Sequence, residues 1–164
     1  MSVDDFLKIL QGLLTPVIGA IATYIAWQQW KTNQRKLDLD RYERRLKIYQ
    51  EVKQIFGRVL GARKATSNEL VAFITAVSEA DFLFDTDVPA YIDEIYRRGL
   101  NLWSWSEQYR DYTQDIPQGY DHAKVVAEMH KELEWFASQP KPAKDLFSKY
   151  LSIGGWSIVF ADTT

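Results

Sequence analysis

Apolar residues recur at steps of three and four from residue 32 to residue 63, a stretch that contains no proline. This spacing aligns them on one face of a helix with 3.6 residues per turn and therefore predicts a long amphipathic helix. We expect this helix to continue directly from the apolar segment that precedes it. Its inward positions are Leu39, Tyr42, Leu46, Tyr49, Val52, Phe56 and Val59.

A capping pattern predicts the start of a second helix. Thr66 or Ser67 can accept a hydrogen bond from the first turn, in which Glu69 follows. The apolar pattern then extends this helix through residue 83. Its inward side chains are Leu70, Phe73, Ile74, Val77 and Leu83.

Three more helices are predicted from residues that cap the start of a helix or end it. Asp87 before a first-turn proline predicts a third helix that ends near Tyr112, and Asp121 predicts a fourth that two prolines end at residues 140 and 142. A short fifth helix runs through Leu151, and an irregular tail begins at about residue 153. The inward side chains are Ile92, Ile95, Leu102, Trp103 and Tyr109 in the third helix, Val125, Val126, Met129, Leu133 and Phe136 in the fourth, and Leu146, Phe147, Tyr150 and Leu151 in the fifth.

No alternating strand pattern interrupts these segments, so the predicted fold class is all-α. The expected organisation is a short flank (1–8), a transmembrane helix (9–30) and an antiparallel helical bundle (31–164). The chain has 164 residues, which suits one such bundle, and it has no cysteine. Disulfides, iron–sulfur clusters and Cys-type zinc sites are therefore excluded.

The transmembrane prediction rests on 22 consecutive residues, 9–30, without a charge. A helix of this length spans about 33 Å, enough for a bilayer core of about 30 Å. A cleaved signal peptide would need a basic residue cluster before it, whereas here the flanking charges are reversed. A buried helix of a soluble protein is the other alternative. The predicted membrane-interface residues are Tyr24, Trp27, Trp30, Lys31, Arg35 and Lys36, and these basic residues orient the chain with its N-terminus outside and its bundle in the cytoplasm.

A second pattern within this segment predicts self-association. Small and amide-bearing residues recur at alternating steps of four and three, which keeps them on one seam of the helix. Small side chains let membrane helices approach closely, and hydroxyl and amide groups bond across the contact. The alternative is a polar stripe that faces lipid or another protein. The oligomerisation residues are Gly12, Thr15, Gly19, Ala22 and Ala26, and the seam extends to Gln29 and Asn33.

Charge is divided unevenly along the chain. Residues 31–64 carry eleven basic and four acidic side chains, whereas residues 65–164 carry eight basic and sixteen acidic ones. The first basic residues lie within reach of anionic lipid of the inner leaflet, and those beyond Arg41 are interpreted as a solvated face that pairs with acidic helices. Nucleic-acid binding is not expected, because the protein as a whole is acidic and lacks a recognition motif.

No pattern predicts catalysis, a cofactor or a metal. His122, His130 and Glu134 share a helix face, but the two histidines lie about 12 Å apart along the axis, too far to reach one ion. An acidic cluster of Asp81, Asp85 and Asp87 is better explained by capping and solvation than by acid–base chemistry. Trp105 turns about 200° away from the inward Trp103, so it is either a partner-binding anchor or a contact with the C-terminal segment.

Several segments resemble a family of small bacterial single-span membrane proteins of unassigned function that carry a cytoplasmic helical domain. The resemblance involves residues 26–33 (AWQQWKTN), 36–39 (KLDL), 42–45 (YERR), 48–49, 79–84 (EADFLF), 91–92, 135–136 and 147–151 (FSKYL). It covers most of the chain up to Leu151 and implies an anchored helical domain in the bacterial inner membrane, with no catalytic or binding residues.

Taken with the patterns above, this resemblance leads to an expected function. The expected function is a non-enzymatic, membrane-anchored module that self-associates and binds a cytoplasmic protein partner. The alternative is an effector whose assembled spans disrupt or permeate the bilayer.

Overall fold

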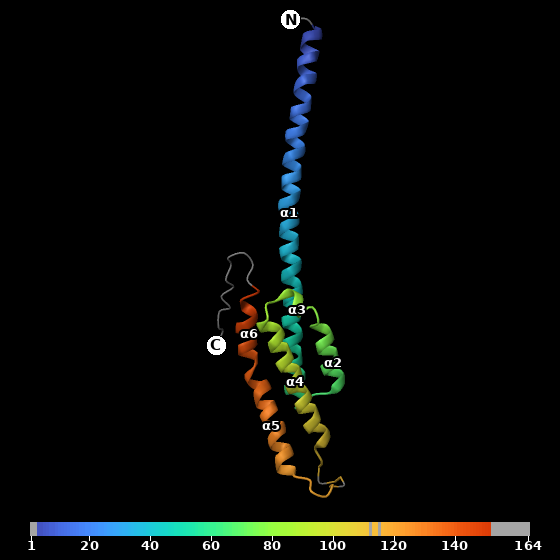
Figure 1. The fold of residues 1–164 in the computed structure, drawn as a ribbon, viewed down its shortest axis with the longest axis vertical. Helices are drawn as coiled ribbons and strands as arrows, with labels where there is room; N and C mark the ends of the chain where they lie inside the picture. The colour runs from blue at the N-terminus through green and yellow to red at the C-terminus, as the bar shows by residue number, and fades with distance from the viewer. Residues whose placement is uncertain (1–2, 112, 115, 152–164) are drawn as a thin grey trace. The chain divides into compact units, whose positions relative to one another are not determined.

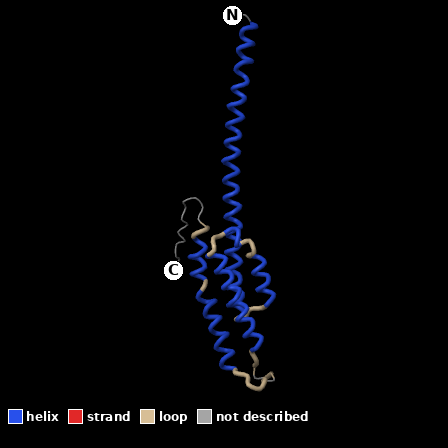
Figure 2. Tube along the Cα trace, in the orientation of Figure 1, coloured by secondary structure: helices blue, strands red, loops and turns tan. Residues whose placement is uncertain are grey.

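The computed structural model describes the backbone of residues 3–111, 113–114 and 116–151, and the side chains from residue 16 onward within those ranges. Six helices occupy this part of the chain, and it contains no strand, as Figure 2 shows. The prediction of an all-α protein is therefore confirmed. The predicted tail from residue 153 lies outside the described residues.

The chain divides into two compact units, Met1–Arg41 and Tyr42–Thr164. Helix α1 (Val3–Ala62) contributes residues to both of them. The prediction that the amphipathic helix continues from the apolar segment is confirmed by this single helix. Within the described part of the chain, no helix has a stretch that is both long and apolar enough to cross a membrane. The side chains of residues 9–15, the start of the predicted span, lie outside that part.

The second unit is a helical bundle in which α4 (Asp87–Gln108) lies between two neighbours (Figure 1). Helices α2 (Ser67–Ala76) and α5 (His122–Ser138) both pack against α4, and α6 (Pro140–Ser148) continues from α5. The short α3 (Ala80–Leu83) links α2 to α4. The loop between α4 and α5 reverses the chain, so these two helices run in opposite directions.

One core holds these helices together. Tilted and edge-on ring contacts join distant segments: Phe56 of α1 lies 6.1 Å from Phe136 of α5, and Tyr49 lies 5.2 Å from Phe147 of α6, between ring centroids. Packing of this kind is the main stabilising contribution in a small domain. The largest fully buried side chains are Phe136, Phe147, Ile55, Leu70, Ile95, Leu102, Val52, Val59, Val77 and Val88.

The predicted caps are confirmed at two helix starts. Thr66 forms a capping box, in which its hydroxyl accepts a hydrogen bond from the Glu69 N–H while the Glu69 carboxylate accepts from the Thr66 N–H. Asp121 accepts a hydrogen bond from the N–H of Lys124 at the start of α5. Asp87, in contrast, is the first residue of α4 rather than its cap.

Several details of the predicted elements are wrong. Leu39, predicted to face inward, is 50% exposed, and the last helix ends at Ser148 rather than at Leu151. The second helix does not run through residue 83, because a turn at 77–79 divides it into α2 and α3. The third helix ends at Gln108, and Tyr109, predicted to face inward, is exposed. Val126 is also exposed, because its neighbour Val125 takes the inward position and adjacent helical residues point about 100° apart.

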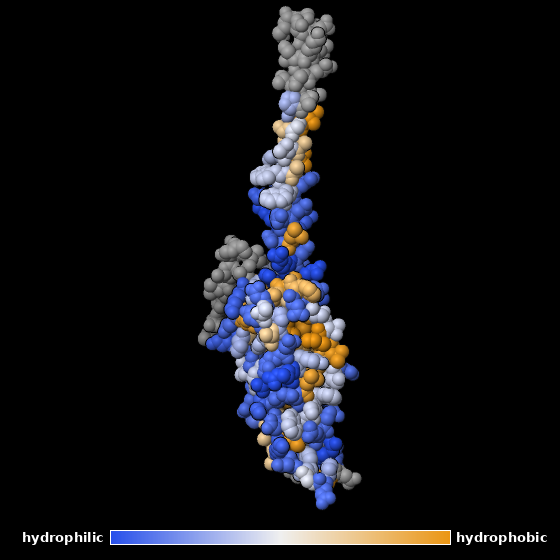
Figure 3. Space-filling view, viewed as in Figure 1, coloured by the Kyte–Doolittle hydropathy of each residue, from blue (hydrophilic) through white to orange (hydrophobic). Residues whose placement is uncertain are grey.

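Polar residues cover most of the visible surface of the second unit, and apolar side chains gather over α2 and α3 (Figure 3). Phe82 of α3 is 89% exposed, and Val71 of α2 is 54% exposed. An isolated exposed apolar side chain is common on protein surfaces, but a phenylalanine this accessible is a candidate contact for another molecule.

Candidate functional site

The helix of the first unit exposes every described side chain from Pro16 to Arg41. Four aliphatic residues are among them, with exposed fractions of 52% for Val17, 57% for Ile18, 55% for Ile21 and 49% for Ile25. An isolated helix in water would leave this apolar surface without a partner. This exposed apolar surface makes the segment a candidate contact for another molecule.

An aromatic and cationic edge runs along one side of this helix. The ring centroids of Tyr24 and Trp27 are 6.3 Å apart, and the Lys31 Nζ lies 5.5 Å from the centroid of the Trp27 ring. The side-chain amide of Gln28 donates to the Tyr24 hydroxyl over 2.9 Å. These contacts follow the three- and four-residue spacing of neighbours on a helix surface. Three of the predicted membrane-interface residues are thus brought together, and Trp30, Arg35 and Lys36 are exposed nearby in the sequence.

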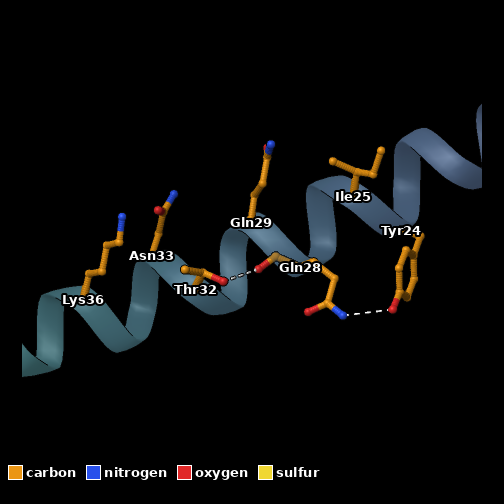
Figure 4. Close-up of a pocket in the computed structure, with 7 residues that line it drawn as sticks. All are labelled: Tyr24, Ile25, Gln28, Gln29, Thr32, Asn33 and Lys36. Atoms are coloured by element: carbon orange, nitrogen blue, oxygen red, sulfur yellow. Dashed lines mark hydrogen bonds between the residues drawn. The ribbon is translucent and has the colours of Figure 1, made fainter.

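Another edge of the same helix carries amides. Figure 4 shows Ile25, Gln29, Asn33 and Lys36 projecting to one side, while Tyr24 and Gln28 project to the other. Together with Thr32 these residues line an open groove of about 550 Å³. One edge of the helix therefore carries aromatic side chains that contact their neighbours on the same helix, and another edge carries amides.

The predicted oligomerisation residues lie on the same helix, either along the amide-bearing edge or N-terminal to it. Gly19, Ala22 and Ala26 are exposed, and a Cβ built on Gly19 would meet nothing within 4 Å. Glycine in a helix interior costs about 1 kcal/mol relative to alanine, and packing against the described residues does not require a glycine at this position. Only the helical backbone of Gly12 and Thr15 is described.

In the second unit, the acidic cluster is organised by Tyr150. Its hydroxyl donates its single proton to Asp87 Oδ1 over 2.6 Å, and Asp85 Oδ2 lies 3.1 Å from the same hydroxyl oxygen. The hydrogen bond to Asp87 is the main reason why the pKa of Asp87 is lowered, and it also raises the pKa of Tyr150. Lys149 adds an ion pair of 3.7 Å to Asp87. A groove of about 330 Å³ lies beside this cluster, with Phe84 among its lining residues.

Arg45 of α1 contacts both the end of α3 and the segment around Tyr150, at the end of the bundle where the acidic cluster lies. Its Nε donates to the Leu83 carbonyl over 2.8 Å, and its Nη1 donates to the Tyr150 carbonyl over 3.3 Å. The guanidinium also lies 5.6 Å from the Phe84 ring centroid and 5.5 Å from that of Tyr150. The neighbouring Arg44 pairs with Glu79 over 3.3 Å. This last pair agrees with the expectation that the basic stretch contacts acidic helices.

A buried carboxylate in the bundle was not predicted. Glu132 is 3% exposed and accepts hydrogen bonds from Arg98 Nη1 over 3.1 Å and from the amide of Asn101 over 3.3 Å. Arg98 also pairs with Glu94 over 2.8 Å and stacks on Trp135, 5.3 Å from the ring centroid. The burial of Glu132 could have been inferred from helical spacing in the sequence, because Glu132 lies seven residues after Val125 and four before Phe136, both of which are buried. The network is fully paired, so its evident role is to join α4 to α5.

The histidines do not form a metal site in the described part of the chain, where no group of three or more His, Asp or Glu side chains could hold an ion. His130 instead pairs with Glu134 over 3.0 Å on the surface of α5. His122 begins α5 and lies near two rings, 5.6 Å from Tyr109 and 6.1 Å from Tyr120 between centroids.

Trp105, the predicted partner-binding anchor, is half-buried on α4. The C-terminal segment, its other predicted contact, lies outside the described residues, so both interpretations stay predictions; Phe82 is far more accessible. The high exposure of Phe82 could not be read from the sequence, because its position follows the unpredicted turn between α2 and α3.

Comparisons with protein-family models, with curated proteins and with solved structures find no match to this chain. The resemblance to single-span bacterial proteins thus stays a prediction. Function is inferred from the residues and contacts described above.

Proposed function

We propose that this protein is a non-enzymatic, membrane-anchored helical module of the bacterial inner membrane that self-associates through its N-terminal helix and binds a cytoplasmic protein partner through its bundle. The observation that carries the proposal is the helix of residues 16–41, which buries no described side chain. Its exposed aliphatic residues suit a lipid environment, and so does the uncharged run at residues 9–30.

The position of the aromatic edge supports this placement. Tyr24 and Trp27 lie at the C-terminal end of the proposed span, where amphipathic rings favour the headgroup region. Lys31 and Arg35 follow them and would meet anionic lipid of the inner leaflet, at about 1 kcal/mol for each basic residue near the surface. The N-terminus is then outside and the bundle is in the cytoplasm.

A reporter enzyme fused after Thr164 tests this topology. A reporter active only in the cytoplasm should be active, because Lys31, Arg35 and Lys36 outweigh the single lysine before the span. Replacing these three residues with glutamine should weaken the preference. A periplasmic reporter that is active at the same position would contradict the proposed orientation.

Self-association is supported by Gly19, where an added Cβ would meet nothing within 4 Å in the described part of the chain. A two-hybrid assay of membrane spans, built on residues 1–36, should lose signal in Gly19→Leu because the added side chain separates the two backbones. Val17→Leu is the matched control, since it adds bulk away from the seam. Equal signals from wild type and Gly19→Leu would leave a plain anchor.

The partner-binding surface is proposed to include Phe82, with Trp105 as a second contact. A pull-down with residues 31–164 from a cytoplasmic lysate identifies proteins that depend on these side chains. A specific partner should be lost with Phe82→Ala and kept with Phe82→Tyr, because an accessible ring is the expected anchor. Proteins that bind all variants equally would not support this surface.

The alternative proposal is a membrane-perturbing effector. Its motivation is the set of polar side chains Gln28, Gln29, Thr32 and Asn33, which line one groove. Ion leakage from vesicles that contain the full chain would favour this alternative. Intact vesicles at the same protein density would favour the anchored module.

A further inference from the structure

The exposed ring of Phe82 lies close to the point at which the chain leaves the described part of the bundle. Arg45 donates to the carbonyl of Leu83 and to the carbonyl of Tyr150, so both carbonyl groups contact one guanidinium. The rings of Phe84 and Tyr150 also pack edge-on, with their centroids 5.2 Å apart. The residues that follow Tyr150 therefore start beside the short helix α3, on which Phe82 is 89% exposed.

The sequence that follows is apolar. It carries no charge until Asp162, and an uninterrupted apolar surface of this kind is rarely left in water by a folded protein. An extended chain covers about 3.3 Å per residue, so Trp156 reaches up to about 17 Å from Leu151. The pair Gly154-Gly155 permits a reversal of direction within that distance. The segment is thus long enough to reach Phe82, and its apolar residues are Ile153, Trp156, Ile158, Val159, Phe160 and Ala161.

The charges around Phe82 favour an uncharged segment over a membrane surface as its cover. Asp81 within α3 and Asp85 just after it are both exposed. Anionic lipid attracts basic side chains and repels carboxylates such as these. An uncharged segment of the chain meets no such repulsion, so it is the better occupant of this surface.

Trp105, the other contact predicted for the C-terminal segment, is a less suitable site. Tyr150 contacts Asp87 at the start of α4, whereas Trp105 lies about 27 Å further along that helix. Trp105 is also half-buried, so it offers less open surface than Phe82 does. Both the distance and the exposure therefore favour Phe82.

We propose that residues 153–161 of the same chain pack over Phe82 and so cover the surface that is assigned above to a cytoplasmic partner. The contact does not depend on the proposed function, whereas the competition with a partner rests on it. A segment tethered a few residues from its site has an effective concentration in the millimolar range. A partner therefore has to displace this segment before it binds Phe82.

Photo-cross-linking tests the contact in the full chain in bacterial membranes. The photoreactive residue p-benzoylphenylalanine at position 82 should cross-link to residues 153–161 of the same chain, which trypsin releases on the fragment after Lys149. At position 126, where Val126 is an exposed apolar residue of α5, the same photoreactive residue should not reach them. Cross-links from position 82 only to a second copy, to lipid or to another protein would overturn the proposal, as would the absence of any cross-link.

Thiol labelling tests the cover, because the chain has no cysteine of its own. Asp81→Cys places a thiol next to the exposed ring, and a maleimide should modify it several-fold faster in a chain that ends at Leu151 than in the full chain. The full chain with Ile158→Ser and Phe160→Ser should show the same increase. Val126→Cys is the matched control and should react at one rate in all three chains. Equal rates at residue 81, or a similar increase at residue 126, would overturn the proposal.

The outcomes separate this inference from the proposed function. If residues 153–161 cross-link to position 82 while no partner depends on Phe82, the segment covers this surface and the proposed partner binding is wrong. If Phe82→Ala loses a partner but the cross-link does not form, the partner surface is correct and the inference is wrong. If both results hold, the partner should bind the chain that ends at Leu151 several-fold more tightly than the full chain. Equal affinities would overturn the competition.

Discussion

Gly99 marks a close approach between two helices of the bundle. A Cβ built at this position on α4 would lie 2.4 Å from Leu70 Cδ2 on α2. Leu70 is fully buried, so its side chain has no open space into which it could turn. Gly99→Ala should therefore force the two helices apart or push Leu70 into an unfavourable rotamer.

The size of the effect follows from two opposing contributions. An ordinary contact needs 3.4–4 Å, so the Leu70 methyl group has to move by about 1 Å. Overpacking of this kind costs about 1 to 3 kcal/mol, while alanine in place of glycine in a helix interior gains about 1 kcal/mol. Gly57→Ala on α1 separates the two contributions, because a Cβ at Gly57 would meet nothing within 4 Å. It should gain the helix contribution without the clash.

The comparison can be made in residues 31–164, which contain the whole core of the bundle and should give a helical circular dichroism spectrum and a cooperative transition. The free energy of unfolding of Gly99→Ala should lie about 1 to 3 kcal/mol below that of Gly57→Ala, or roughly 4 to 12 °C in the thermal midpoint. In a Leu70→Ala background the difference should disappear. If Gly99→Ala and Gly57→Ala have the same stability in the wild-type background, the close approach of α2 and α4 is not a constraint.

Three further predictions concern the same bundle. Phe56→Ala should cost about 3 to 5 kcal/mol in denaturant titrations, because this ring is 3% exposed and packs against Phe136; a loss below about 1 kcal/mol would place it outside the core. Glu132→Ala should cost about 1 to 3 kcal/mol by the same assay, since it leaves donors of Arg98 unpaired, whereas Glu134→Ala on the surface should change little. Stability should fall as pH drops below about 4, because the pKa of Asp87 is lowered from 3.8 in the folded state and the unfolded chain therefore takes up the proton first. Tyr150→Phe should weaken this pH dependence in thermal scans, and an unchanged profile would exclude the hydrogen bond to Asp87 as its source.

Local patterns were sufficient to predict the starts of α2 and α5. Thr66 and Asp121 form the predicted caps, because a side chain that satisfies the first free N–H groups acts within a few residues. The contacts among Tyr24, Trp27 and Lys31 likewise follow from helical spacing alone.

Contacts between distant residues could not be predicted in the same way. No glycine or proline marks the turn at 77–79, where Arg44 binds Glu79. Arg45 binds the carbonyl of Leu83 at the end of the following helix, α3. The end of α4 depends on a similar contact, in which the Arg110 N–H donates to the Tyr120 hydroxyl across the following loop. Sequence periodicity contains no information about such partners, because they come from 10 to 38 residues away.

The hydrogen bond from Arg45 to the Tyr150 carbonyl has a consequence for how the protein is made. The two residues are 105 positions apart, and a ribosome adds about 5 to 20 residues per second. The guanidinium thus emerges roughly 5 to 20 s before the carbonyl that it binds. During that interval only Phe84, one of the two rings that flank Arg45, has been synthesised. The end of the bundle that Tyr150 completes therefore stays open. Chaperones of the nascent chain therefore have a window of several seconds in which to engage it.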